Sequence, residues 1–478
     1  MPISQPPEFQ PMAPEIREKY NALRQPGSQD KLCHAPFKNM YIGYGGKVGA
    51  CTYNRQHFLG NYPRQSLKEI WNGERAEKLR RHVSAWDFSA GCHPCRLHFE
   101  GGNLAGVKAK MYDAVPLNPN GYPSVLELEL SNACNLQCIQ CSGVFSSAIR
   151  KFREKKPPIE IPYDEAFLEQ MEEFIPHLTE FKFYGGEPFL IEPYYRLWES
   201  VARLKPEIRI SLQTNATVLN DRAKSIMERT NFHFNISLDS TDKQTFESIR
   251  IGARFDKVME NLRYIKDYCK RKETFFGISA CVLQENWHDI PKLVDFCNKM
   301  DAVIYFHTIA IPTKHALWKL PRSKIEEICR FLDAVSPPSS TELERKNKFS
   351  YEHLVSMVHL WKEKAARREE ERRMLDEKGM GNMERLVEIL RQRILHDQNL
   401  SREDKESKIS LAEKSIESIF QRLPKDFPVQ TAVRKMEDIF EEADTDEFLA
   451  EMGNAEGELV LRYIQSDSDG ITRFFWEN

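Results

Sequence analysis

Residues 125–143 read VLELELSNACNLQCIQCSG and are the most informative part of the chain. The segment opens with an alternating apolar run that predicts a β-strand. Cys134, Cys138 and Cys141 follow directly, on a predicted loop, with three and two residues between them. Three thiolates on one loop can hold three irons of a [4Fe-4S] cluster and leave the fourth iron open to another ligand. An open iron indicates a catalytic centre.

Other interpretations of the cysteines are weaker. Zinc sites usually present paired Cys-x2-Cys or His ligands, and this triplet has no fourth ligand nearby in the sequence. Disulfides are disfavoured, because tight groups of cysteines in a reducing compartment are typical of metal or cofactor ligation. The remaining cysteines lie in apolar segments and are predicted to pack as small core residues. They are Cys269, Cys281, Cys297 and Cys329.

The triplet begins a series of six short β-rich segments that alternate with helical patterns. This order predicts an α/β fold with a parallel sheet and an active site at the carboxyl ends of its strands. Six repeats are too few for a closed eight-stranded barrel, so we expect an open, partial (β/α)6 barrel. The predicted strands lie within 124–130, 180–186, 207–215, 232–240, 275–283 and 302–310.

A second set of cysteines precedes the first predicted strand. Cys33 precedes an aromatic and β-branched segment, residues 40–54, which contains Cys51, breaks at Gly45-Gly46 and predicts a β-hairpin. One helix is predicted over residues 66–83, and a Cys92-x2-Cys95 pair follows. Four thiolates close a cluster, so this set should transfer electrons or stiffen the domain. A structural zinc site formed by the same four cysteines is the alternative.

Bulk properties exclude some functional classes. The 478 residues carry a formal net charge of −3, which indicates neither a nucleic-acid footprint nor a membrane-binding surface. The N-terminus has proline and charge where a signal peptide needs an apolar stretch, and no run of 18 apolar residues occurs. We therefore expect a cytoplasmic protein.

The domain organisation follows from changes in pattern along the chain. We expect a flexible arm at 1–30, a small Cys-rich α+β domain at 31–115 and the partial barrel at 120–335. Residues 340–478 are highly charged, with apolar residues at three- and four-residue spacing, and predict a helical extension. Its charge runs are interpreted as solvated helix faces, with docking of a partner as the alternative.

The Cys-x3-Cys-x2-Cys loop after the first strand of a six-fold strand–helix repeat resembles the radical S-adenosylmethionine (SAM) superfamily, over residues 120 to 320. The resemblance implies that SAM chelates the open iron and is cleaved reductively to a 5'-deoxyadenosyl radical, which removes hydrogen from a substrate. Gln140 stands where the family usually has an aromatic residue next to adenine.

Motifs at later strand ends resemble the SAM-binding segments of the same family. The glycines of a GGEP segment would let the backbone approach SAM. Each motif also has a simpler interpretation. The GGEP segment, residues 185–188, could be only a turn, and the polar residues at the ends of the third and fourth predicted strands could be only helix caps. Arg250 could form only a surface ion pair. The SAM-binding residues implied are Gly185, Gly186, Glu187, Thr214, Asn215, Ser237, Asp239 and Arg250.

The N-terminal cysteine set resembles the twitch or SPASM auxiliary-cluster domain of radical SAM enzymes. The further cysteines of a full SPASM pattern are absent, so the shorter twitch type matches better. In the family this domain usually follows the barrel, whereas here it precedes it. The resemblance implies an auxiliary [4Fe-4S] cluster held by Cys33, Cys51, Cys92 and Cys95.

These resemblances imply a radical SAM oxidoreductase that abstracts hydrogen from a C–H bond with help from the auxiliary cluster. We expect a peptide or protein substrate that is oxidised, cross-linked or epimerised, and an electron donor such as flavodoxin or ferredoxin. A small-molecule dehydrogenase or epimerase, for example on an aminosugar, is the alternative. A more remote alternative is a non-enzymatic scaffold that binds an iron-sulfur cluster or zinc. The sequence identifies no general base or hydrogen donor.

Overall fold

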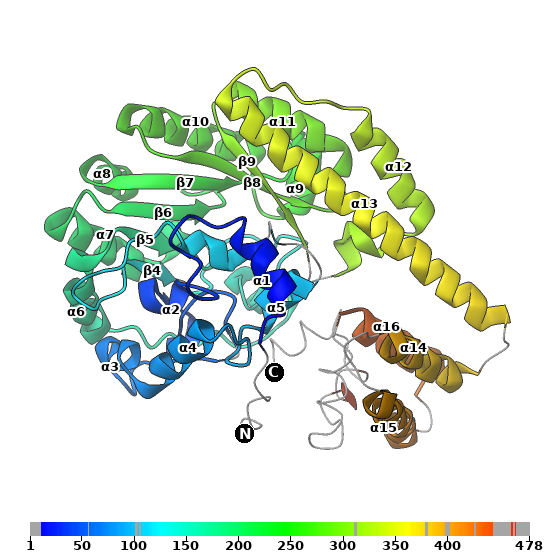
Figure 1. The fold of residues 1–478 in the computed structure, drawn as a ribbon. Coiled ribbons are helices and arrows are strands. Elements are labelled where there is room, and N and C mark those ends of the chain that lie inside the picture. Colours follow the sequence, from blue (N-terminus) through cyan, green and yellow to red (C-terminus); the bar gives the residue numbers. More distant parts are fainter. Residues whose placement is uncertain are drawn as a thin grey trace. The chain divides into compact units, whose positions relative to one another are not determined.

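The computed structural model describes residues 11–55, 57–100, 104, 107–309, 313–377, 381–396, 402–424, 427–442, 460–461 and 464. The chain divides into two compact units (Figure 1). As far as they are described, unit 1 comprises Met1–Leu238, Asp242–Ser279 and Lys299–Val303, and unit 2 comprises Asp239–Thr241, Ala280–Asn298 and Ile304–Asn478.

The described residues form one nine-stranded sheet. Its strands are β1 (Asn39–Ile42), β2 (Lys47–Gly49), β3 (Gly60–Asn61), β4 (Val125–Leu128), β5 (Glu180–Phe183), β6 (Arg209–Thr214), β7 (Asn231–Ser237), β8 (Phe276–Val282) and β9 (Val303–Thr308). They lie in the order β3-β2-β1-β4-β5-β6-β7-β8-β9. The pairs formed by β1, β2 and β3 are antiparallel, whereas β1 pairs with β4 in parallel and the neighbouring pairs from β4 to β8 are parallel.

The predicted α/β class with an open parallel sheet is confirmed. Strands β4 to β9 each overlap one of the six predicted segments. The predicted hairpin is also present, as β1 and β2. Sequence analysis did not foresee that β1 would extend the same sheet, with Asn39 beside Val125 and Ile42 beside Leu128.

Helices cover the outer face of strands β4 to β7 (Figure 1). They are α6 (Glu165–Phe174), α7 (Glu192–Leu204), α8 (Asp221–Arg229) and α10 (Phe255–Lys272). Asp164 and Asn220 cap two of them, because each side chain accepts a backbone N–H of the first turn. Along β6 and β7 buried and half-buried residues alternate, so one face packs against helices and the other carries polar side chains.

The apolar core of unit 1 centres on Trp198 of α7, which is fully buried. Its ring packs edge-on against Phe183 of β5 and Phe232 of β7, with centroid separations of 5.5 and 5.3 Å. Such contacts add to the burial of a large apolar side chain. Aromatic packing thus joins α7 to β5 and β7 on the side of the sheet opposite its polar face.

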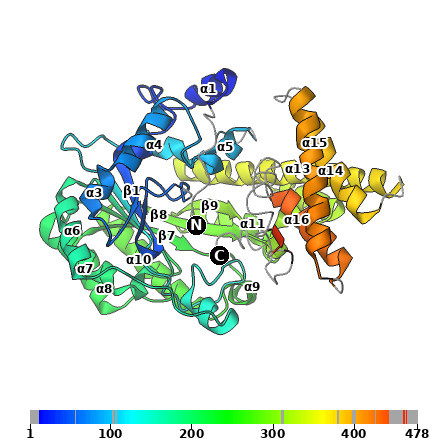
Figure 2. The same ribbon diagram turned by 90° about the horizontal axis from the view of Figure 1, so that it is seen from below.

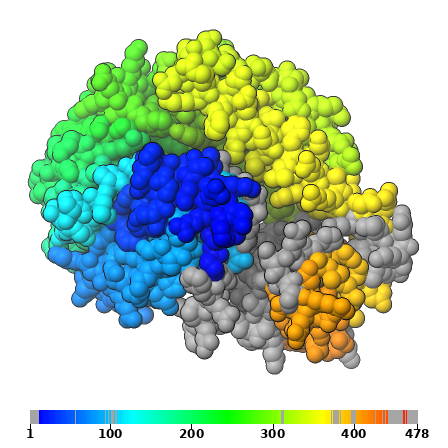
Figure 3. Space-filling model, in the orientation of Figure 1, coloured from blue at the N-terminus to red at the C-terminus, as the bar shows by residue number. Residues whose placement is uncertain are grey.

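The N-terminal segment differs from the flexible arm that we expected. Residues 1–10 lie outside the described residues, but α1 (Pro14–Asn21) is helical and its Tyr20 is fully buried. Arg24 forms a buried two-pronged ion pair with Asp113, with N–O distances of 2.9 and 2.6 Å. In Figure 3 the dark blue residues lie on the surface beside lighter blue residues of the same unit. The segment is thus packed rather than free.

The single helix predicted over 66–83 is wrong. The structure has α3 (Leu67–Trp71) and α4 (Glu74–Ser84), with a break at Asn72 and Gly73. Gly73 is extended, and a β-carbon there would lie 2.9 Å from the carbonyl oxygen of Glu69. A glycine inside a helical pattern lowers the stability of the helix, and here it separates two helices.

Unit 2 is mainly helical. It contains α12 (Arg322–Asp333), α13 (Glu342–Glu377), α14 (Asn382–His396), α15 (Arg402–Arg422), α16 (Val429–Glu442) and most of α11 (Ile290–Lys299). Helices α14, α15 and α16 lie next to one another (Figure 2). They share an apolar core that includes Leu390, Ile416 and Met436. The described part of the predicted extension is therefore helical. None of the described helices is long and apolar enough to cross a membrane.

We predict that Trp198→Ala lowers the stability of unit 1 by about 3–5 kcal/mol, because it leaves a cavity among aromatic rings. The apparent melting temperature of the metal-free protein checks this. Leu190→Ala, at a side chain that is 41% exposed, is the control and should change the melting temperature little. Equal melting temperatures for both variants would contradict the central role of Trp198.

Candidate functional site

The cysteine loop after β4 is held by hydrogen bonds on two sides. The hydroxyl of Ser147 accepts the Cys134 N–H at 3.1 Å and donates to the Cys134 carbonyl oxygen at 3.2 Å. From the other side, the N–H groups of Gln137 and Ile139 donate to the carbonyl oxygens of Ile251 and Ile249, at 2.8 and 2.9 Å. The loop is thus fixed by the turn that follows it and by the end of α9 (Lys243–Ile249).

The three thiols of this loop lie close together in a half-buried place. Cys138 is buried, and Cys134 and Cys141 are half-buried. Burial, together with the nearby Cys138 and Cys134 thiols, raises the pKa of Cys141 to about 12. Thiols in this environment stay protonated until a metal displaces the protons. The donor set of three soft sulfurs matches an iron-sulfur cluster with one open iron.

Two glycines at the end of β5 let the chain touch this loop. Gly185 has φ +95°, and a β-carbon there would lie 2.5 Å from the carbonyl oxygen of Ser131. At Gly186 a β-carbon would lie 2.3 Å from the carbonyl oxygen of Ala133. The N–H of Gly186 donates to Ser131 at 3.0 Å. Both positions need glycine because the backbone of the cysteine loop passes directly over them.

Glu187 links the end of β5 to the end of β6. Its side chain is fully buried and accepts the hydroxyl of Thr214 at 2.6 Å and the N–H of Asn215 at 2.7 Å. Burial raises the pKa of Glu187 to about 7, although these hydrogen bonds favour the ionised form. The carboxylate therefore organises the strand tips from within, and Asn215 turns its amide nitrogen to 3.9 Å from the Cys134 sulfur.

The remaining predicted SAM-binding residues occupy different surroundings. Arg250 is buried after α9, and its positive charge lowers the pKa of both Cys134 and Glu187, so it lies near the same loop. Ser237 is half-buried on β7, where the Gln213 amide nitrogen lies 3.5 Å from its hydroxyl oxygen. Asp239 belongs to unit 2, is fully buried and accepts the N–H of Cys281 at 2.8 Å.

Sequence reasoning missed Asn135, which lies within the triplet. Its amide nitrogen donates to the Thr217 hydroxyl at 3.0 Å, and its oxygen lies 3.4 Å from the Asn215 amide nitrogen. It therefore joins the cysteine loop to the tip of β6. A polar residue between two ligand cysteines was the available signal, but its partners lie about eighty residues away.

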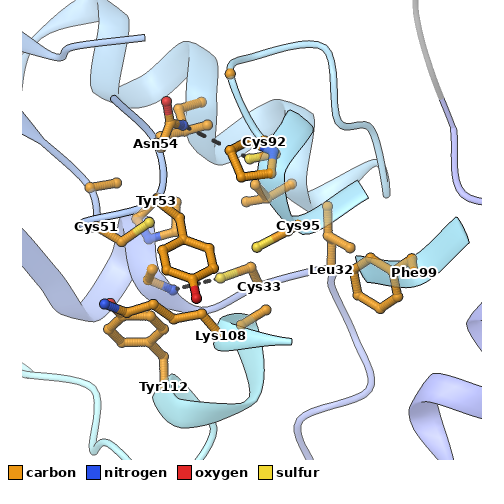
Figure 4. Close-up of a pocket in the computed structure, with 18 residues that line it drawn as sticks. Leu32, Cys33, Cys51, Tyr53, Asn54, Cys92, Cys95, Phe99, Lys108 and Tyr112 are labelled. Carbon is orange, nitrogen blue, oxygen red and sulfur yellow. Dashed lines mark hydrogen bonds between the residues drawn. The ribbon is translucent and has the colours of Figure 1, made fainter. Parts of the chain in front are cut away.

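The second cysteine set converges on one pocket of unit 1 (Figure 4). Cys33 precedes α2 (Ala35–Lys38), and Cys51 follows β2. Cys92 directly precedes α5 (His93–Glu100), and Cys95 lies in its first turn. All four thiols line the pocket together with apolar and aromatic side chains, and Asn54 lies 3.9 Å from the Cys92 sulfur. Segments about sixty residues apart thus supply one site.

The chemistry of this pocket suits a metal-sulfur group. Burial raises the pKa of Cys92, and the neighbouring Cys95, Cys33 and Cys51 thiols raise it further. Four half-buried thiols that repel one another when ionised need bound positive charge. Among the described residues, no three His, Cys, Asp or Glu side chains form a site for a single metal ion. No disulfide joins any of the eleven cysteines. Cys269, Cys297 and Cys329 are buried as predicted, whereas Cys281, for which we expected the same, is half-buried.

Comparison with family models matches both cysteine sets. The model described as "Radical SAM superfamily" matches residues 128–297, and the SPASM model, described as "Iron-sulfur cluster-binding domain", matches residues 33–96. The chain carries a radical SAM domain and a SPASM domain. The predicted resemblance is thereby confirmed, including the order in which the SPASM domain comes first. SAM and [4Fe-4S] clusters are the cofactors of these domains.

Individual relatives match only in part. A probable GTP 3',8-cyclase of Methanocella arvoryzae is 33% identical over 143 residues, which is 29% of this chain and 42% of that protein. The GTP 3',8-cyclase of Listeria welshimeri is 28% identical over 217 residues, which is 43% of this chain and 60% of that protein. The chain thus spans about half the length of these curated relatives.

Two solved structures match parts of the chain. SuiB of Streptococcus suis, bound to the precursor peptide SuiA, is 17% identical with a TM-score of 0.34, over 57% of this chain and 53% of that one. Native anSMEcpe with bound AdoMet is 21% identical with a TM-score of 0.35, over 44% of this chain and 59% of that one.

We predict that Gly185→Ala prevents the triplet from binding iron, because the added methyl group collides with the loop backbone. Gly121→Ala is the matched control: Gly121 also has positive φ, at +78°, but a β-carbon there meets nothing within 4 Å. Iron content after anaerobic reconstitution should fall by about half in Gly185→Ala and stay unchanged in the control. Full iron loading of both would show that the loop tolerates the displacement.

We also predict that Glu187 makes the stability of the metal-free protein depend on pH. Its folded pKa of about 7 exceeds its ordinary 4.5, so the folded chain holds a proton that the unfolded chain releases. The protonated form favours folding at low pH, and this contribution, roughly 3 kcal/mol, is lost as pH rises from about 4.5 to 7.

Glu187→Gln should therefore remove part of the pH dependence of the apparent melting temperature between pH 5 and 8. Glu207→Gln, at an exposed position, changes the charge equally and serves as the control. If the Glu187→Gln profile runs parallel to that of the unmodified protein, the assignment of the raised pKa is wrong.

Proposed function

We propose that this radical SAM enzyme binds a [4Fe-4S] cluster through Cys134, Cys138 and Cys141 and acts on a substrate C–H bond. The observation that carries the proposal is the loop itself: three clustered thiols, fixed on both sides, next to the polar tips of β5 and β6. When bound, the cluster supplies the electron that cleaves SAM to methionine and a hydrogen-abstracting 5'-deoxyadenosyl radical.

The residues around the loop have distinct roles in this proposal. Arg250 supplies positive charge for the carboxylate of SAM, and Asn215 offers an amide beside Cys134. Gly185 and Gly186 bring the backbone to the loop, while Glu187 holds Thr214 and Asn215 in place. Buried and pre-oriented groups need little rearrangement when SAM binds. The assignments of Ser237 and Asp239 to SAM binding stay predictions.

We further propose that Cys33, Cys51, Cys92 and Cys95 bind an auxiliary [4Fe-4S] cluster. Four protein ligands leave no open iron, which suits electron transfer rather than binding of SAM. Held by these four cysteines, such a cluster would supply a one-electron acceptor or donor for the substrate radical. An external donor such as flavodoxin or ferredoxin would supply the electron for SAM cleavage.

For the substrate we propose a peptide or protein. Helices α13 to α16 support this assignment, because their described surface carries large apolar side chains that a partner chain could cover. These side chains are Phe349, Met383, Leu395, Leu411 and Val429. A nucleotide or another small molecule, such as an aminosugar, is the second candidate. The partial sequence similarity to GTP 3',8-cyclases favours it.

We predict that the anaerobically reconstituted protein, given dithionite and SAM, forms 5'-deoxyadenosine, measured by mass spectrometry. Changing Cys134, Cys138 and Cys141 together to Ala should abolish the product, because no open iron remains. Cys329→Ala, at a buried cysteine far along the chain in α12, is the control and should retain the activity. Product from the triple variant would contradict the assignment of the loop.

Adding GTP to the same assay separates the two substrate classes. A peptide-modifying enzyme should show the same rate of 5'-deoxyadenosine formation with and without GTP. A rise in that rate, with consumption of GTP, would contradict the peptide assignment and support the nucleotide candidate.

A further inference from the structure

Lys108 lies on the wall of the pocket that holds the four N-terminal cysteines (Figure 4). It begins a 3-10 helix, Lys108–Tyr112, and its side chain is only 14% exposed. The ammonium group donates to the hydroxyl of Thr52, which follows Cys51, and lies 5.3 Å from the ring centroid of Tyr53. A cation is therefore fixed at the edge of the cysteine pocket.

Glu127 of β4 lies beside Lys108. Its side chain is fully buried, and one carboxylate oxygen lies 3.8 Å from the Lys108 ammonium nitrogen. The other oxygen lies 3.5 Å from the Lys182 ammonium nitrogen and accepts the Tyr112 hydroxyl at 3.2 Å. Lys108 and Lys182 share this one carboxylate, so the positive charge of Lys108 is only partly compensated. A buried carboxylate of this kind is costly unless it has such partners.

The charge of Lys108 reaches the thiols. Burial raises the pKa of Cys51, and the positive charge of Lys108 is the largest influence in the opposite direction. Burial likewise raises the pKa of Cys95, which Lys108 lowers through its charge and its backbone N–H. The negative charge of Glu127, in contrast, raises the pKa of Cys51. Two opposite charges on neighbouring elements thus face the same group of sulfurs.

We propose that Lys108 raises the reduction potential of the auxiliary cluster and that Glu127 moderates this effect. The inference rests on the proposed ligation of that cluster by the four cysteines. Reduction adds one negative charge to the cluster, and a nearby cation stabilises the reduced form while a carboxylate destabilises it. Lys108 thereby makes the auxiliary cluster a better electron acceptor for a substrate radical, whereas a purely structural role would leave the potential unchanged.

A redox titration of the auxiliary cluster alone tests the proposal. The parent is the full chain with Cys134, Cys138 and Cys141 changed to Ala, so that only one cluster remains. The midpoint potential is followed by the electron paramagnetic resonance signal of the reduced cluster. Lys108→Met should lower the reduction equilibrium about tenfold or more, which corresponds to ~59 mV for a one-electron couple.

Three further variants separate charge from structure. Lys108→Arg keeps the cation and should restore most of the potential. Lys110→Met removes a lysine of the same 3-10 helix that does not line the pocket, and should change nothing. Glu127→Gln removes the carboxylate charge and should shift the potential upward, opposite to Lys108→Met. General disruption of the pocket would move both in one direction.

The outcomes separate this inference from the proposed function. Opposite shifts for Lys108→Met and Glu127→Gln support the inference, and equal or absent shifts overturn it while leaving the cluster assignment intact. If Lys108→Met fails to hold a cluster, the sign of the Glu127→Gln shift still decides. A parent that binds no iron would overturn the proposed auxiliary cluster, and the inference with it.

Discussion

The site depends on one close contact, in which the backbone at Gly185 and Gly186 passes beneath the carbonyl oxygens of Ser131 and Ala133. No side chain fits in that space, so the cysteine loop and the end of β5 lie against each other as backbone. Glu187 follows at once and ties the same point to the tip of β6 through Thr214. The cysteine loop, β5 and β6 are therefore in direct contact, and these contacts fix the positions of the three thiols.

The parallel pairing of β1 with β4 explains how a cysteine domain can precede the barrel in sequence. Residues 39–42 lie beside residues 125–128. The segment that follows β2 and the segment that precedes β4 therefore lie at the same end of these strands. This brings Cys51 close to Lys108, and Lys108 close to Glu127 on β4. The auxiliary pocket thereby lies next to β4, the first strand of the six-fold repeat.

Local patterns in the sequence were enough to predict the six strands, the hairpin, both cysteine sets and the burial of Cys269, Cys297 and Cys329. These features arise from periodicity and spacing, which a single chain displays. The pairing of β1 with β4 and the role of Glu187 depend on contacts between distant segments, which periodicity does not encode. The break at Gly73 is local, but a helical pattern on both sides concealed it. The same limit applies to Lys108, whose partner Glu127 is identified only when two elements pack together.

Both cysteine sites share an electrostatic arrangement. Ionised thiolates in a half-buried place repel one another, and each site has a cation from another element nearby: Arg250 beside Cys134, and Lys108 beside Cys51. Each also has a fully buried carboxylate, Glu187 or Glu127. The carboxylates differ in their partners. Glu187 accepts hydrogen bonds from neutral groups and has a raised pKa, whereas Glu127 lies between two lysines. Glu187 can change its charge near neutral pH. At the auxiliary site, Lys108 and Glu127 instead place an ammonium group and a carboxylate 3.8 Å apart on neighbouring elements.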